Sequence, residues 1–243
     1  MAENFSLLID AATNDVLSHY RDKAGVLAIL LIGSAAQGTF DKYSDVDFLL
    51  IFNAKQKIAR KQYVDKSGAM VELLFYDLTE VKNILKKEKY ALVRNTSHML
   101  AHSKVILSND GAVVEELIKN AQTNMKTKTR YSDKEILMHL YSINDFLSDA
   151  RRDVDNQDPV AFYLDSNNLI QNMIDQLLKI NGQYNVKPKD MKALLSALDN
   201  EFCSLLIAFD KETVLGKKLH ILEAMKAVAI RVAGKNLTDT WEI

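Results

Sequence analysis

Residues 27 to 52 constrain the fold more strongly than any other stretch of the chain. Two apolar runs, Leu27 to Ile32 and Val46 to Phe52, flank a polar insert that opens with Gly33-Ser34. Short apolar runs bounded by turn residues are typical of buried strands. The stretch therefore predicts two core strands joined by a small-residue turn and a loop.

The second apolar run is accompanied by two carboxylates. Asp45 and Asp47 are two residues apart, so their side chains project from the same face of a strand. Two like charges at this spacing repel unless a cation lies between them. Mg²⁺ takes oxygen ligands and is often shared with substrate phosphates, so the pair is a candidate magnesium site. The alternative interpretation is that both carboxylates only solvate the end of the strand.

The order of these strands, turn and carboxylates resembles the motif of the nucleotidyltransferase superfamily that includes DNA polymerase beta. That motif consists of an apolar strand, a Gly-Ser pair, a spacer and an Asp-apolar-Asp sequence before a further apolar run. Here the matching residues are Gly33-Ser34 and Ser44-Asp45-Val46-Asp47. The resemblance implies that Gly33, Ser34 and Ser44 belong to the nucleotide-binding part and that Asp45 and Asp47 bind the metals. Gly38, in the insert, is a candidate phosphate contact because glycine allows close backbone approach, although a plain flexible loop explains it equally well.

A third carboxylate lies within the next apolar run. Residues 69 to 76 read AMVELLFY, in which Glu72 interrupts a β-prone sequence. An unpaired carboxylate costs several kcal/mol when buried, so Glu72 is either an edge-strand surface residue or a functional one. Superfamily members carry a third carboxylate on the neighbouring strand, and kanamycin-type enzymes have it in a similar setting. The resemblance therefore implies that Glu72 is the third metal-site carboxylate.

The second half of the chain is expected to be helical. A polar, basic stretch at residues 123 to 132 marks a boundary, so we predict domains at residues 1–125 and 126–243. The apolar period of 3.6 residues predicts helices that begin near Asp133, at Pro159 with Asp158 as N-cap, near Pro188, near Phe202 and near Val214. The predicted fold class is α+β: an N-terminal nucleotidyltransferase mixed sheet flanked by helices, followed by an all-α helical bundle.

The helical half also resembles the substrate-binding domains that follow the catalytic domain in aminoglycoside and lincosamide nucleotidyltransferases. The similarity rests on five residues, Asn181, Gly182, Tyr184, Pro188 and Lys189, before a Leu-rich helix. Lys187 or Lys189 is a candidate contact to the nucleotide phosphates, with Lys189 the one we select, although a lysine at the start of a helix is at least as often only solvated.

Together these features imply a reaction. We expect transfer of a nucleoside monophosphate from an NTP, most simply ATP, to a hydroxyl of a small acceptor such as an antibiotic. A two-ion Mg²⁺ site would be held by Asp45, Asp47 and Glu72. Some aminoglycoside enzymes of this superfamily use a carboxylate of the helical domain as the base, so the resemblance implies Asp145 by rough position, although family bases at this place are often Glu. Glu72 is the alternative base if it is not a metal ligand. Tyr141 and Asp149 are candidate acceptor contacts, although a solvated helix face explains them too.

The composition of the chain bears on which binding partners we expect. The net charge is −1, which is unlike a protein that binds nucleic acid nonspecifically. The single cysteine, Cys203, and the absence of a signal-like or spanning apolar segment lead us to expect a cytoplasmic protein without a membrane partner. The alternatives are protein nucleotidylation and a nucleotide-binding regulatory module without catalysis. Related antibiotic enzymes include dimers, so a homodimer is compatible with the resemblance.

Overall fold

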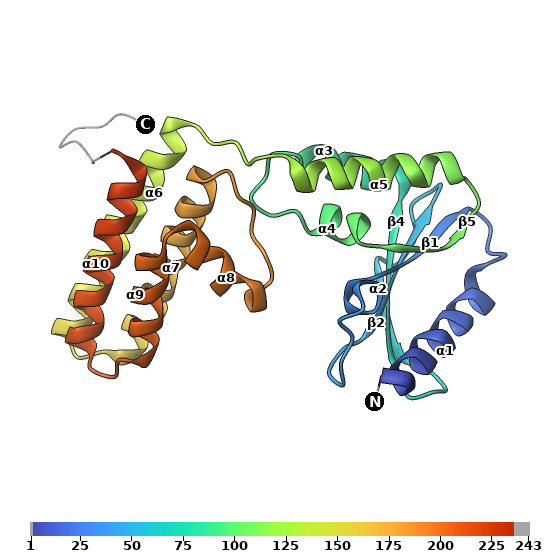
Figure 1. Ribbon diagram of the computed structural model, residues 1–243, viewed down its shortest axis with the longest axis horizontal. Helices are drawn as coiled ribbons and strands as arrows, with labels where there is room; N and C mark the ends of the chain where they lie inside the picture. The colour runs from blue at the N-terminus through green and yellow to red at the C-terminus, as the bar shows by residue number, and fades with distance from the viewer. Residues whose placement is uncertain (1, 236–243) are drawn as a thin grey trace. The chain divides into compact units, whose positions relative to one another are not determined.

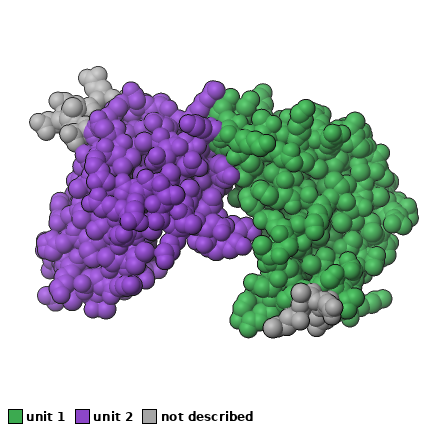
Figure 2. Space-filling model, in the orientation of Figure 1, with its two compact units in different colours: residues 1–90, 94–127 green, residues 91–93, 128–243 purple. Residues whose placement is uncertain are grey.

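The computed structural model describes residues 2–235, with side chains from residue 5 onward. The chain divides into two compact units, which Figure 2 colours separately. Unit 1 comprises residues 1–90 and 94–127, and unit 2 comprises residues 91–93 and 128–243. The predicted domain boundary after residue 125 stays a prediction, and the two units are described one at a time.

A mixed sheet forms the centre of unit 1 (Figure 1). Within the described residues its order is β3-β4-β2-β1-β5, and only the β2–β4 pair is parallel. The sheet and the helices around it confirm the predicted α+β class. The strands are β1 (Val26–Ile32), β2 (Val46–Phe52), β3 (Arg60–Val64), β4 (Met70–Asp77) and β5 (Lys104–Ser108).

Helices cover both faces of this sheet. On one face α1 (Ala2–Tyr20) packs against alternate strand residues such as Phe48 and Leu50. On the other face Leu49 and Ile51 pack against three helices: α3 (Leu78–Glu88), α4 (Asn95–Ala101) and α5 (Gly111–Lys126). Because both faces are buried, the central strands read as continuous apolar runs, which is why the sequence predicts them well.

One strand was not predicted, and two local predictions were wrong. The polar stretch after Asn53 contains β3, which forms a hairpin with β4. Gly33-Ser34 was predicted to be a turn, but it begins the short helix α2 (Gly33–Gln37). The polar stretch from residue 123 was predicted to lie between elements, but α5 continues to Lys126.

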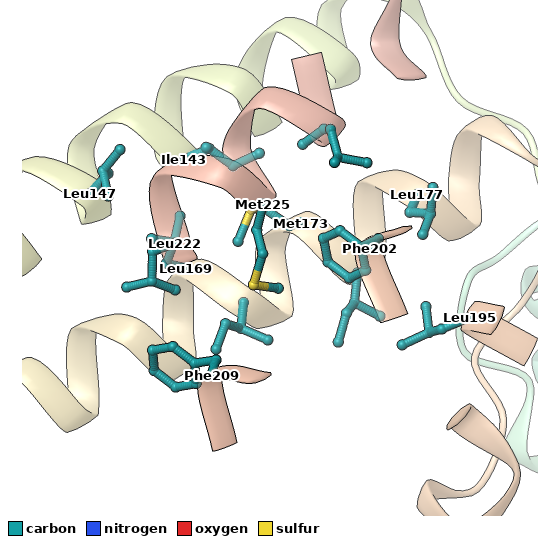
Figure 3. Packing of buried hydrophobic residues seen from close by; sticks show 14 of the residues in the cluster. Ile143, Leu147, Leu169, Met173, Leu177, Leu195, Phe202, Phe209, Leu222 and Met225 are labelled. Carbon is teal, nitrogen blue, oxygen red and sulfur yellow. The ribbon is translucent and has the colours of Figure 1, made fainter. Parts of the chain in front are cut away.

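Unit 2 is helical, as predicted. Its helices are α6 (Asp133–Asp155), α7 (Pro159–Ile180), α8 (Pro188–Leu198), α9 (Asn200–Lys211) and α10 (Leu215–Ala233). Asp158 caps α7 by accepting hydrogen bonds from the backbone N–H groups of Val160 and Ala161, and Gly234 ends α10 in the left-handed conformation. The core between these helices is formed by Leu, Ile, Met and Phe side chains (Figure 3).

None of the described helices is both long enough and apolar enough to cross a bilayer.

Candidate active site

Strand register brings the predicted carboxylates together. In the parallel β2–β4 pair, Asp47 lies directly opposite Glu72. Asp45 precedes β2 by one residue, and the nearest carboxylate oxygens of Asp45, Asp47 and Glu72 all lie within 4.8 Å of one another. We call these three residues the acidic triad. The structure therefore contains the carboxylate cluster that the sequence predicts.

The triad lies where one face of the sheet loses its helical cover. Asp47 shares its face with Leu49 and Ile51, which are buried against α3, α4 and α5. Asp47 and Glu72 themselves are only partly buried. A carboxylate that keeps contact with water avoids most of the cost of burying a charge, which lowers the cost of placing three of them close together.

Gly33 packs directly against the triad. It follows β1, whose last residue, Ile32, is paired with Asp47. Gly33 has φ +67°, and a Cβ atom added there would collide with the Oδ2 atom of Asp47. The left-handed backbone and the close approach both require glycine. In the structure Gly33 therefore shapes the carboxylate site, in addition to the nucleotide contact predicted for it.

Two residues of β3 reach the triad and were missed by the sequence interpretation. Gln62 Nε2 donates a hydrogen bond of 3.3 Å to Asp45 Oδ2. Arg60 forms an ion pair with Glu72 through its Nε atom. In the antiparallel β3–β4 pair Gln62 lies opposite Glu72 and Arg60 opposite Leu74, so Arg60 is a diagonal neighbour of Glu72. The edge strand β3 thus supplies the guanidinium group of Arg60 and the amide group of Gln62 to the site.

The insert between α2 and β2 is held by its own hydrogen bonds. The Ser44 hydroxyl donates to Asp41 Oδ1 at 3.0 Å and accepts from the Asp41 backbone N–H at 3.1 Å. Gly38, at φ +71°, ends α2 by donating its N–H to the carbonyl of Ser34. Both residues thus shape the loop that leads into Asp45, and their predicted nucleotide contacts stay predictions.

The triad suits a hard divalent cation. Oxygen ligands bind Mg²⁺ at about 2.1 Å, so two ligands on opposite sides of one ion are about 4.2 Å apart. The 4.8 Å limit on the triad oxygens is close to this span, and all three donors are carboxylates. Among the side chains that the structure describes, residues 5–235, no other group of His, Cys, Asp and Glu meets the same criterion. The donor set therefore fits the metal expected from the sequence.

The predicted residues of unit 2 lie on its surface. Tyr141 is 47% exposed, Asp145 and Lys189 are exposed, and Asp149 forms an ion pair of 2.8 Å with Arg152. The ion pair offsets part of the negative charge that would attract a cationic acceptor to Asp149. The roles predicted for these four residues stay predictions.

Asp149 also belongs to a crowded acidic cluster in unit 2. Asp153 is 3% exposed and lies on α6 near Asp165 of α7. Burial raises the pKa of Asp165 above 3.8, and the hydrogen bond and charge of Asp153, together with the charge of Asp149, raise it further. The folded protein therefore binds this proton more tightly than the unfolded chain does. The stabilisation is present below the unfolded pKa and is lost as the pH rises through the folded pKa.

We accordingly expect Asp165→Asn to stabilise the protein at pH 7, because it removes the repulsion between Asp165 and its two neighbours. The melting temperature should rise only slightly, by about 1–2 °C, because water around the partly exposed Asp165 screens the repulsion. Thermal unfolding at pH 7 measures the effect, with Asp210→Asn as an exposed control that removes the same charge. An unchanged or lower melting temperature for Asp165→Asn would contradict the repulsion.

Comparison with known proteins agrees with the geometry. Residues 14–102 match the family model described as "Nucleotidyltransferase domain". The chain therefore contains a nucleotidyltransferase domain, which confirms the superfamily and the enzyme class predicted from the sequence. The matched residues include β1, α2, β2, β3 and β4 and thus all three members of the triad.

A solved structure extends the likeness to more of the chain. The crystal structure of a nucleotidyltransferase-like protein from Exiguobacterium sibiricum 255-15 matches with a TM-score of 0.55 and 14% sequence identity. The match covers 93% of this chain and 77% of that chain. At this identity the likeness shows a shared fold. No curated protein sequence gives a significant match.

Proposed function

We propose that the protein transfers a nucleoside monophosphate from an NTP, most simply ATP, to a hydroxyl group of a small acceptor, and releases pyrophosphate. The observation that carries the proposal is the acidic triad, which lies within the nucleotidyltransferase domain on one face of the sheet. An aminoglycoside or lincosamide antibiotic is the acceptor class that we propose, from the resemblance of the helical half.

The triad would hold the divalent cation. Asp45 and Asp47 are its two central ligands in this proposal, and Glu72 is the third. Bound Mg²⁺ would neutralise the negative charge on the phosphates during an in-line displacement. The Ser34 hydroxyl and the backbone N–H groups at the start of α2 would donate hydrogen bonds to the phosphate oxygens, with Lys189 as a further phosphate contact.

The bond changes define what the remaining residues must do. The acceptor oxygen forms a bond to the α-phosphorus, the bond from the α-phosphorus to the bridging oxygen breaks, and pyrophosphate leaves. The acceptor proton must pass to a base, for which Asp145 and Glu72 are the two candidates. Tyr141 and Asp149 would contact the acceptor beside Asp145.

Release of pyrophosphate tests the proposal directly. The purified protein is incubated with Mg²⁺, each of the four NTPs and a panel of aminoglycosides and lincosamides. Pyrophosphate that appears only when both NTP and acceptor are present, together with a nucleotidylated acceptor by mass spectrometry, is the expected result. Failure of every antibiotic would contradict the acceptor class, and labelling of a protein in its place would favour protein nucleotidylation. Nucleotide binding with no transfer to any acceptor would favour the regulatory module.

We expect Asp145→Asn to lower the turnover rate about 10²-fold or more, with little change in the KM for the NTP. A general base contributes about 10²–10⁴-fold, and asparagine keeps the shape of the side chain but cannot accept the proton. Steady-state kinetics with the acceptor found above measure the effect. Asp155→Asn, an exposed residue two turns or more further along α6, removes the same charge and serves as the control. Unchanged turnover for Asp145→Asn would leave Glu72 as the candidate base.

A further inference from the structure

The ion pair between Arg60 and Glu72 joins two side chains that differ in how freely they can move. The Glu72 side chain is 14% exposed and lies between β2 and β3, where its strand is paired on both sides. The Arg60 side chain is 63% exposed and projects from β3, the edge strand of the sheet. Glu72 is therefore fixed by the sheet, while the guanidinium group has room to move away from it.

Arg60 and a divalent cation would compete for the carboxylate of Glu72. Arg60 Nε forms an ion pair with the Oε1 atom of Glu72, and the same carboxylate would supply a ligand to the metal. A guanidinium group beside an incoming Mg²⁺ also repels it, because both are positive and close together. Binding of the cation should therefore weaken the ion pair, and the ion pair should weaken binding of the cation.

The chemistry of arginine indicates where the displaced side chain would go. Arg60 lies on the same sheet face as Gln62, whose side chain already reaches Asp45. The site is expected to receive a triphosphate, and a guanidinium group donates two parallel hydrogen bonds to phosphate oxygens. A phosphate group next to the metal is thus a suitable new partner for Arg60.

We propose that Arg60 is a positioning residue that changes partners: it pairs with Glu72 in the metal-free protein and binds the phosphates of the nucleotide once the metal occupies the triad. The proposal rests on the metal site assigned under the proposed function. It gives Arg60 two opposite effects, since the residue competes with the metal alone and assists binding of the metal–nucleotide complex.

Mn²⁺ binding separates these two effects, with electron paramagnetic resonance as the readout and no acceptor present. We expect Arg60→Gln to bind Mn²⁺ alone about 3–10-fold more tightly than the wild type, because the competing guanidinium is gone. The same variant should bind ATP in the presence of Mn²⁺ about 10-fold more weakly, because one phosphate contact is lost. Arg60→Lys keeps the charge near Glu72 but lacks the planar fork, so it should bind Mn²⁺ like the wild type and ATP more weakly.

Lys61→Gln is the matched control. Lys61 is the next residue on β3 and carries the same charge, but it projects from the opposite face, where its Nζ atom lies over the Tyr63 ring. This variant should behave like the wild type in both titrations. If Lys61→Gln changed Mn²⁺ binding as much as Arg60→Gln, the effect would be one of net charge and the specific role of Arg60 would be excluded.

Asp47→Asn distinguishes failure of this inference from failure of the metal site. Loss of Mn²⁺ binding in Asp47→Asn, with Arg60→Gln identical to the wild type in both titrations, would overturn the partner exchange and leave the metal site intact. Equal Mn²⁺ binding by the wild type and Asp47→Asn would overturn the metal site, and the role of Arg60 with it. Circular dichroism of each variant verifies that β3 and the rest of the fold are retained.

Discussion

Replacement of Asp47 by asparagine is expected to lower the rate of pyrophosphate release about 10³-fold and to abolish binding of Mn²⁺ in the absence of nucleotide. Asparagine has the same shape but carries no charge, so the triad loses a third of its negative charge at the position paired with Glu72. Metal coordination contributes several kcal/mol to reactions of this kind, and each 1.4 kcal/mol or so corresponds to about tenfold in rate. Rates with the acceptor and Mn²⁺ titration measure the two effects.

The fold of this variant should be unaffected or slightly more stable. Removal of one of three neighbouring carboxylates relieves repulsion in the metal-free protein, so the melting temperature should not fall. Mn²⁺ should raise the melting temperature of the wild type but not that of Asp47→Asn, because a ligand stabilises only the state that binds it. Asp10→Asn, on the exposed side of α1, removes the same charge as a control. Activity of Asp47→Asn within threefold of this control would exclude Asp47 as a metal ligand.

The fold was most predictable where buried apolar residues recur in the sequence at the spacing of a helix or strand. In unit 2 the stripe of Ile136, Leu140, Ile143 and Leu147 recurs at helical spacing, and all four residues are buried. Asp158 before Pro159 marks the start of α7 directly, through capping chemistry. Here each local signal agrees with the packing, so the prediction and the structure coincide.

The edge strand β3 was missed because its sequence carries little hydrophobic pattern. An edge strand pairs on one side only, and in β3 Tyr63 is the one large side chain that packs into the core. The signal that could have revealed it is the turn at residues 65–68, which precedes β4: Asp65 accepts hydrogen bonds from the backbone N–H groups of Ser67 and Ala69, and Gly68 has φ +87°. A turn of this kind directly before a strand is typical of a hairpin.

The contrast between apolar and polar segments also explains which site residues could be predicted. Asp45, Asp47 and Glu72 are conspicuous because a carboxylate beside or within an apolar run is costly unless water, hydrogen bonds or a cation compensate its charge. Arg60 and Gln62 stand in a stretch that is polar throughout, so nothing in their residue types separates them from a solvated loop. Only the register of β3 against β4 places them beside the triad. The nucleotide contact of Gly33 stays a prediction, and its contact with Asp47 follows from a backbone conformation that sequence spacing does not reveal.

Replacement of Gly33 by alanine is expected to damage both the fold and the metal site. Alanine at φ +67° is strained by about 1–2 kcal/mol, and its Cβ atom would displace the Asp47 carboxylate from the triad. We expect the free energy of unfolding to fall by about 2–4 kcal/mol, since the collision adds to the strain. Mn²⁺ binding and pyrophosphate release should both fall by 10²-fold or more, in line with the effect of moving a reacting group by about 1 Å.

Gly68→Ala separates backbone strain from the effect on the triad. Gly68 also has a positive φ, +87°, but a Cβ atom added there would meet no other atom within 4 Å. This variant should therefore lose about 1 kcal/mol of stability and keep Mn²⁺ binding, because the strain is the same in kind while Asp47 is untouched. Urea denaturation gives the stability of both variants, and Mn²⁺ titration at a temperature where both are folded gives the affinity. If Gly33→Ala bound Mn²⁺ as tightly as Gly68→Ala, the close packing of Gly33 on Asp47 would have no part in forming the site, and glycine would be needed there for its backbone conformation alone.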